Sequence, residues 1–295
     1  MKSIVALTQR NLKLFFRNKP LVFFSLLSVM IVVGLYVLFL GDINVQNIRS
    51  EIGRDIPQID ALVFAWMLPG AIAISTMTLA LGNMERLVDD GQSETLSDFM
   101  VSPVTRIQLI LSYVVATIII ALLISLLMVG VSLIVVASKG GGWMNPWTLI
   151  EVMGIVLLMI ISSSLLSLLI ASFISSANTY GVVNSITGTF IGFVTGCYMP
   201  MGIMPVFVQN LFNALPVSMG ASLLRQLYLA PIMEDVFAGA PESVVTDYRI
   251  FQGIDLVMFG HVLSPMVMLG TMVAGIAVLF LLNVVRFKGL HKRLS

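Results

Sequence analysis

The sequence predicts an all-α integral membrane protein with six transmembrane helices. Of its 295 residues, 58% are hydrophobic and only 11% are charged. The mean hydropathy of +1.01 lies well above that of ordinary soluble domains. A helix needs roughly 20 apolar residues to cross a bilayer. Runs of about that length fall at 21–40, 61–81, 109–137, 152–174, 182–199 and 261–285.

Residues 1–19 are expected to form an amphipathic helix that lies in the membrane interface and ends before Pro20. Its apolar side chains recur near helical spacing at Ile4, Leu7, Leu14 and Phe15. Its basic residues occupy the other side at Arg10, Lys13 and Arg17. Residues 20–288 then form the six-span domain, and 289–295 form a basic tail.

Residues 82–106 form a charged loop between spans two and three. They include a third of the fifteen acidic residues, at Glu85, Asp89, Asp90, Glu94 and Asp98. We expect Ser93 to cap a short helix that Pro103 ends. Apolar Leu96 and Phe99 beside these acids favour a docking surface for a partner over a plain solvated loop, the alternative interpretation.

Spans four and five carry small residues at helical spacing. Gly188, Gly192 and Gly196 predict close helix packing and, as a second interpretation, a seam that opens during transport. Ser164, Ser167 and Ser175 predict packing first and a polar pathway second. Glu151 is a weaker pathway candidate, because Trp143 and Trp147 just before it are typical of an interfacial belt.

Residues 200–260 are expected to form a re-entrant hairpin and loop on the outer side. Pro200, Pro205 and Pro216 interrupt this half-apolar stretch. A seventh crossing at 203–230 would place the C-terminal basic residues outside, against the positive-inside rule. A short interfacial helix is expected at the end of the loop, on the spacing of Ile250, Phe251, Ile254 and Val257.

The distribution of lysine and arginine predicts the orientation. With six spans, eleven of the sixteen basic residues fall on the side of both termini. Positive residues are retained in the cytoplasm during insertion, so both termini and the 82–106 loop are expected there.

Three segments in this order resemble the membrane subunit of type-2 ABC exporters, a family that includes bacterial drug, antibiotic and polysaccharide permeases. They are "RNLKLFFRNKP", "MERLVDDGQSETLSDFMVSPVTRIQLILSY" and "YMPMGIMPVFVQNLFNALPVSMGASLLRQL". The resemblance implies that the second segment carries a coupling helix for a cytoplasmic ATPase and that the N-terminal helix braces it. Glu94, Thr95, Leu96 and Pro103 match the family's pattern in that loop.

Energy must then come from a partner, because the chain contains no G-x-x-x-x-G-K-[ST] motif. We expect no cofactor on this chain and ATP with magnesium on two separate ATPase subunits. A second permease copy, identical or related, and membrane lipids are the other expected partners. A net charge of +1 gives no basis for nucleic-acid binding, and no Cys/His cluster indicates a metal site.

The sequence thus predicts the permease subunit of an ATP-driven exporter in a bacterial plasma membrane, with an apolar or amphipathic cargo such as a drug, lipid, peptide antibiotic or glycan. The alternatives are an intramembrane serine protease, based on "GASL" at 220–223 and His261, and a secondary carrier or channel. The near absence of charges within the spans disfavours a carrier. A scaffold without transport is a further alternative.

Overall fold

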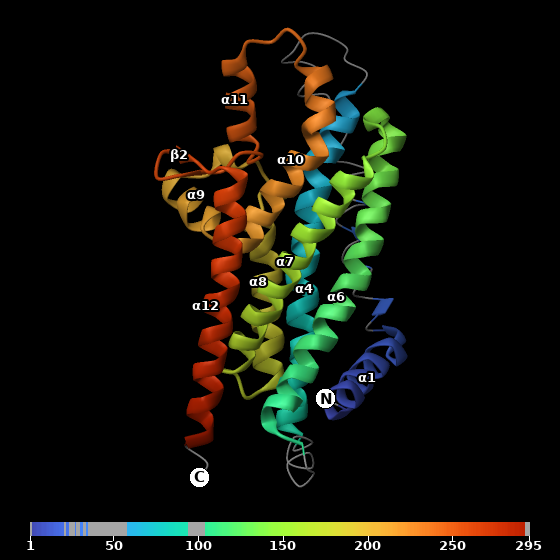
Figure 1. The fold of residues 1–295 in the computed structure, drawn as a ribbon, viewed down its shortest axis with the longest axis vertical. Coiled ribbons are helices and arrows are strands. Elements are labelled where there is room, and N and C mark those ends of the chain that lie inside the picture. Colours follow the sequence, from blue (N-terminus) through green and yellow to red (C-terminus); the bar gives the residue numbers. More distant parts are fainter. Residues whose placement is uncertain are drawn as a thin grey trace.

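The computed structural model shows a bundle of long helices (Figure 1) and describes residues 2–20, 58–93 and 104–292, with a few isolated positions between 22 and 34. Helix α1 (Lys2–Arg17) lies beside one end of the bundle, which we call the α1 end. Helices α10 (Pro216–Val236) and α11 (Glu242–Phe251) lie toward the opposite end, which we call the α11 end.

Helix α4 (Ile59–Gln92) is the centre of the bundle. It contacts α6 (Arg106–Val136), α7 (Pro146–Ala171), α8 (Ala177–Val194) and α10. In its most apolar stretch of 18 residues, 94% is buried inside the chain. In that stretch α4 therefore packs against protein rather than lipid.

The same helix corrects the expected boundary of the 82–106 loop, because α4 continues eleven residues beyond 81. Leu81, Met84 and Val88 are buried at helical spacing, and this packing carries the helix to Gln92. The N–H of Ser93 donates to the carbonyl of Asp89 and closes the last turn. The predicted short helix at Glu94, Thr95, Leu96, Phe99 and Pro103 lies outside the described residues.

Four helices of the described part are long and apolar enough to cross a membrane. They are α4, α6 with the π-helical turn after it (Ala137–Gly141), α7, and α12 (Pro265–Lys292). The expected spans at 61–81, 109–137, 152–174 and 261–285 are therefore confirmed as such helices. Helix α8 has 18 residues but is too polar to join this set, and the first span lies outside the described residues apart from isolated positions.

Residues 200–264 fold into a 3₁₀ turn, three helices and two short strands, and the re-entrant hairpin expected there stays a prediction. After a 3₁₀ turn (Met201–Ile203) come α9 (Val206–Asn213), α10 and α11. Strands β1 (Val257–Met258) and β2 (His261–Val262) then pair antiparallel, a small exception to the all-α prediction. The depth of this region in a membrane stays a prediction.

Two element boundaries in this region differ from the expected ones. His261 lies in β2, so the last helix begins later, at Pro265, after Ser264 accepts a hydrogen bond from the N–H of Val267 at 3.4 Å. Helix α11 ends at Phe251. Ile254 lies beyond it and is fully buried, and its carbonyl accepts a hydrogen bond from the hydroxyl of Ser222. The four apolar residues that predicted an interfacial helix therefore do not share one helix.

A buried arginine joins three segments near the α11 end. Arg225 of α10 is only 1% exposed. Its Nε and Nη2 donate to the carbonyls of Trp66 in α4 and of Gly196 after α8, both at 3.0 Å, and Nη1 donates to that of Gly253 after α11 at 3.4 Å. Gly196 and Gly253 have positive φ, so these carbonyls belong to turns that leave them without a helical partner. The guanidinium supplies the missing donors.

We expect Arg225→Met to lower the free energy of unfolding by about 2–4 kcal/mol, because it leaves buried carbonyls without donors. Thermal unfolding of the purified chain in detergent measures this loss. The matched control is Lys139→Met, which removes a cation that lies 4.0 Å from Asp60 on the surface and should cost less than about 1 kcal/mol. Equal unfolding midpoints for the two variants would contradict a structural role for Arg225.

Candidate functional site

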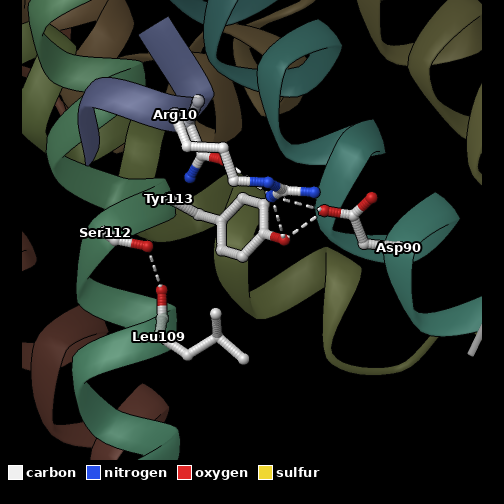
Figure 2. A network of polar contacts seen from close by, with 6 residues as sticks. Arg10, Asp90, Leu109, Ser112 and Tyr113 are labelled. Atoms are coloured by element: carbon white, nitrogen blue, oxygen red, sulfur yellow. Dashed lines mark hydrogen bonds and ion pairs between the residues drawn. The ribbon is translucent and has the colours of Figure 1, made fainter. Parts of the chain in front are cut away.

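Three helices meet through one carboxylate at the α1 end (Figure 2). Nη1 of Arg10 in α1 donates to Oδ2 of Asp90 in α4 at 3.0 Å, and the hydroxyl of Tyr113 in α6 donates to the same oxygen. The same Nη1 lies 3.4 Å from the Tyr113 oxygen. Asp90 is 9% exposed, so its charge is removed from water and compensated within the chain.

Arg10 is the link between α1 and α4. Helix α1 packs along α6, with Leu7, Asn11 and Phe15 buried on its inner face. Burial disfavours the charge of Arg10, but its hydrogen bonds to Asp90 and Tyr113 outweigh this effect and raise its pKa. The guanidinium is therefore charged at any physiological pH.

The last turns of α4 also contact α8. The side-chain oxygen of Gln92 accepts a hydrogen bond from the N–H of Ala177 at 2.8 Å, which satisfies one of the free donors at the start of α8. Glu85, two turns earlier, lies half-buried beside α8. We call Arg10, Asp90, Gln92 and Tyr113 the α4 junction, because through them the end of α4 binds α1, α6 and α8.

Helix α6 begins with a capping box formed by Thr105 and Gln108. The hydroxyl of Thr105 accepts from the N–H of Gln108 at 3.3 Å, and the Gln108 side chain accepts from the N–H of Thr105 at 3.1 Å. This capping box fixes the first turn of α6. Segment 94–103, which holds the expected coupling helix, is thus flanked by two helices that the α4 junction ties together.

The predicted docking acids of the described part differ in where they point. Asp90 faces Arg10 inside the chain, Glu85 is half-buried beside α8, and Asp89 is exposed. The two arginines predicted on the basic side of α1 differ as well: Arg17 is exposed, whereas the side chain of Arg10 points toward Asp90 inside the chain. Arg10 was expected on the polar side of the helix, and its ion pair with Asp90 draws it away from that side.

A pocket of about 330 Å³ opens beside the α4 junction, between α1, α4, α6 and the start of α8. Its wall combines polar side chains of α1 and α4 with apolar side chains of α6. A volume of this size is at the lower end of the range for small-molecule sites.

The three glycines of the expected seam lie against residues of the same chain. A Cβ on Gly188 would lie 3.5 Å from Thr78 of α4, an ordinary contact. A Cβ on Gly192 would lie 2.1 Å from the ring of Tyr198, and Gly196 has a φ of +62° at the end of α8. Each glycine thus has a place in the packing of α8, and whether α8 also opens during transport stays a prediction.

The serines and the carboxylate named as pathway candidates do not come together. Ser164 and Ser167 are fully buried, whereas Ser175 is exposed beyond the end of α7. Helix α7 stops at Ala171, where Arg286 of α12 donates to the carbonyl of Ser172 at 3.1 Å. Glu151 is exposed near the start of α7.

The protease alternative does not fit the geometry. The hydroxyl of Ser222 is buried and donates to the carbonyl of Ile254 at 2.6 Å. His261 is exposed in β2, paired with Met258. A serine nucleophile needs a histidine base within hydrogen-bond reach, and in the described part the hydroxyl of Ser222 bonds a backbone carbonyl instead.

Residues 2–229 match the family model described as ABC-2 type transporter. The chain belongs to the ABC-2 type transporter family. The match extends from α1 into α10 and includes the whole α4 junction. Subunits of this family are transport permeases that are not catalytic by themselves, and they generally act as dimers with an ABC ATPase. A comparison with curated proteins returned no match.

Two residues that organise this ABC-2 permease were not singled out from its sequence. Tyr113 lies in the quoted "RIQLILSY", but nothing in a single span shows that its hydroxyl faces a carboxylate. Asn11 had a readable signal, because it lies one helical turn from both Leu7 and Phe15, two residues of the predicted apolar side. A polar residue on the inner face of an amphipathic helix indicates a polar neighbour.

The glycines of α8 give a matched test of its packing. We expect Gly192→Ala to destabilise the permease by about 1–3 kcal/mol, because the new methyl group displaces Tyr198 from its edge-to-face contact with Phe193. Gly188→Ala should be neutral or stabilise by up to about 1 kcal/mol, since alanine favours a helix. Thermal unfolding in detergent measures both changes. Equal effects of the two variants would contradict the packing of α8 described above.

Proposed function

We propose that this permease is half of the membrane domain of an ATP-driven exporter, with both termini in the cytoplasm of a bacterium. Its family supports transport by an ATPase-coupled permease. The excess of lysine and arginine on the side of both termini supports the orientation. Few charges occur within the spans, which favours an apolar or amphipathic cargo.

The observation that carries this proposal is that the two helices flanking segment 94–103 in the sequence are joined to each other and to α1. Segment 94–103 connects α4, which ends at Gln92, to α6, which begins at Arg106. The α4 junction holds these two helices together and fastens α1 to both. In the proposed mechanism, Leu96 and Phe99 insert into a groove of the ATPase, Glu94 and Asp89 lie at the rim, and Thr95 and Pro103 bound the docking helix.

The contacts of α4 would pass the motion of the ATPase to the other helices of the permease. ATP binding closes two ATPase subunits and pushes on segment 94–103. The push reaches α4 and α6 together, because Asp90 and Tyr113 share a hydrogen bond. It reaches α8 through Gln92 and Ala177. Rigid elements pass such a displacement on, whereas a flexible loop absorbs it.

The exposed face of α8 supports a second permease copy as its neighbour. Val182, Ile186 and Phe190 form an exposed stripe, with exposed Ser185 and Thr189 beside it. A helix of this mixed character is poorly suited to lipid tails. We therefore place the pathway between the α8 helices of two copies, whether identical or related.

The permease contributes no nucleotide chemistry in this proposal. ATP and magnesium bind the two partner ATPase subunits. The residues of this chain position and move the pathway, and the plasma membrane is the site of action.

Leu96→Asp should abolish assembly with the ATPase while leaving membrane insertion intact. An aspartate in an apolar groove loses its hydration without gaining a partner, so the amount of ATPase that co-purifies should fall at least about tenfold. Affinity purification from the native membrane, with insertion checked by fractionation, measures both quantities.

The matched control is Val244→Asp, which places the same charge at an exposed position of α11, at the other end of the molecule. It should co-purify with the ATPase like the unmodified chain. Normal co-purification of Leu96→Asp would overturn the docking site and, with it, the proposed coupling.

A further inference from the structure

The β1–β2 hairpin presents a phenylalanine in a backbone conformation that does not favour it. Its two strands are joined by Phe259 and Gly260, with φ of +49° and +81°. A two-residue hairpin loop with both φ values positive usually carries Asn-Gly, because asparagine and glycine adopt this conformation at low cost. Phe259 is the one non-glycine residue of the described part with a positive φ, and its side chain is 74% exposed. A strained residue that gains so little packing within the chain indicates a contact outside it.

Two asparagines of α9 hold the hairpin in this conformation. Oδ1 of Asn210 accepts a hydrogen bond from the N–H of Phe259 at 2.9 Å. Nδ2 of Asn213 donates to the carbonyl of Val257 in β1, also at 2.9 Å. The hairpin is thus fastened to α9 at its tip and along one strand. The surrounding structure therefore keeps Phe259 in its strained and exposed position.

Other exposed apolar side chains belong to the elements that meet at the hairpin, namely α9, β2 and the first turn of α12. With the hairpin tip they form a set that we call the apolar rim: Phe207, Leu211, Phe259, Val262 and Met266. The segments that carry them, 199–224 and 256–285, contain no aspartate, glutamate, lysine or arginine. A group of large exposed apolar side chains in uncharged segments indicates an apolar partner.

The position of α12 indicates that this partner is lipid. Helix α12 begins at Pro265, directly after β2, and both lie beside α9 (Figure 1). Only 17% of the most apolar stretch of α12 is buried inside the chain, so most of its surface is available to lipid. From Pro265 to Val285 the helix has about the length of one bilayer crossing. The apolar rim therefore lies at the level where a lipid-facing helix enters the membrane.

We propose that the apolar rim inserts into the lipid bilayer at the α11 end, with Phe259 as the inserted tip of the hairpin. Exposed phenylalanine and leucine side chains at this level enter the boundary between lipid headgroups and acyl chains. The carbonyl of Ile254, just before β1, accepts hydrogen bonds from Ser222 and Gln226 of α10 at 2.6 and 3.0 Å. The inserted hairpin thereby keeps the α11 end at a fixed depth. The proposal depends on α12 crossing the membrane and not on the ATPase.

Collision measurements on a spin label at Val262→Cys test this placement, with the single native cysteine replaced as Cys197→Ser. The purified full-length permease is reconstituted into vesicles of phosphatidylcholine and phosphatidylglycerol. Oxygen, which concentrates among acyl chains, should collide with this label more often than a water-soluble nickel chelate does. A label at the exposed Val244→Cys of α11 gives the aqueous reference, and one at the exposed Val273→Cys of α12 gives the lipid reference.

Phe259→Asn separates lipid contact from folding. Asparagine adopts a positive φ more readily than phenylalanine, so the variant should unfold in detergent at a temperature no lower than that of the unmodified chain. Without the aromatic side chain, the label at Val262 should shift toward the aqueous reference. The matched control is Val244→Asn, which removes an exposed apolar side chain outside the apolar rim and should leave the label at Val262 unchanged.

Three results would overturn the proposal. The first is a label at Val262 that collides mainly with the nickel chelate while Phe259 is intact. The second is a label that rarely meets either reagent, because it would assign the apolar rim to a protein contact such as a second permease copy. The third is a label that does not shift in Phe259→Asn, or shifts as much in Val244→Asn. The first two hold even if Phe259→Asn fails to fold.

Discussion

A buried carboxylate in the last turn of α4 determines how the α1 end of the bundle is built. Asp90 has little contact with water, so its charge requires donors from the protein. Arg10 and Tyr113 supply them from two other helices. Removing Arg10 would leave the largely buried charge of Asp90 without its ion-pair partner, at a cost of about 3–5 kcal/mol. The three helices are therefore held in one arrangement next to the segment proposed to meet the ATPase.

At the α11 end the buried charge belongs to a cation and is compensated by backbone groups. The guanidinium of Arg225 donates hydrogen bonds to the carbonyls of Trp66, Gly196 and Gly253. Helix α4 is thus fastened at both ends by a buried polar group, and between them it packs through apolar side chains. Through these contacts α4 joins the α1 end of the bundle to the turns after α8 and α11 at the other end.

Apolar run length predicted the helices well, because crossing a bilayer imposes a length that a sequence displays directly. Four spans and the N-terminal helix followed from local patterns. The details of the site did not. Asp90 and Asp89 are neighbours of the same chemistry, yet one is buried and the other exposed, and only the position of α6 decides which. Helix α4 extended beyond the expected 81 because Met84 and Val88 gain burial against other helices, which periodicity within one segment could not reveal.

The central claim is that α1 and the end of α4 move as one body, and a distance across the Arg10–Asp90 link tests it most directly. Spin labels at Lys13→Cys and Gly91→Cys, two exposed positions, can be introduced with the single native cysteine replaced as Cys197→Ser. Pulsed electron resonance on the permease–ATPase complex should give one narrow distance that shifts by less than about 2 Å on ATP binding. Adding Asp90→Asn should broaden it. A larger ATP-dependent shift in the chain with Asp90 intact would contradict the account.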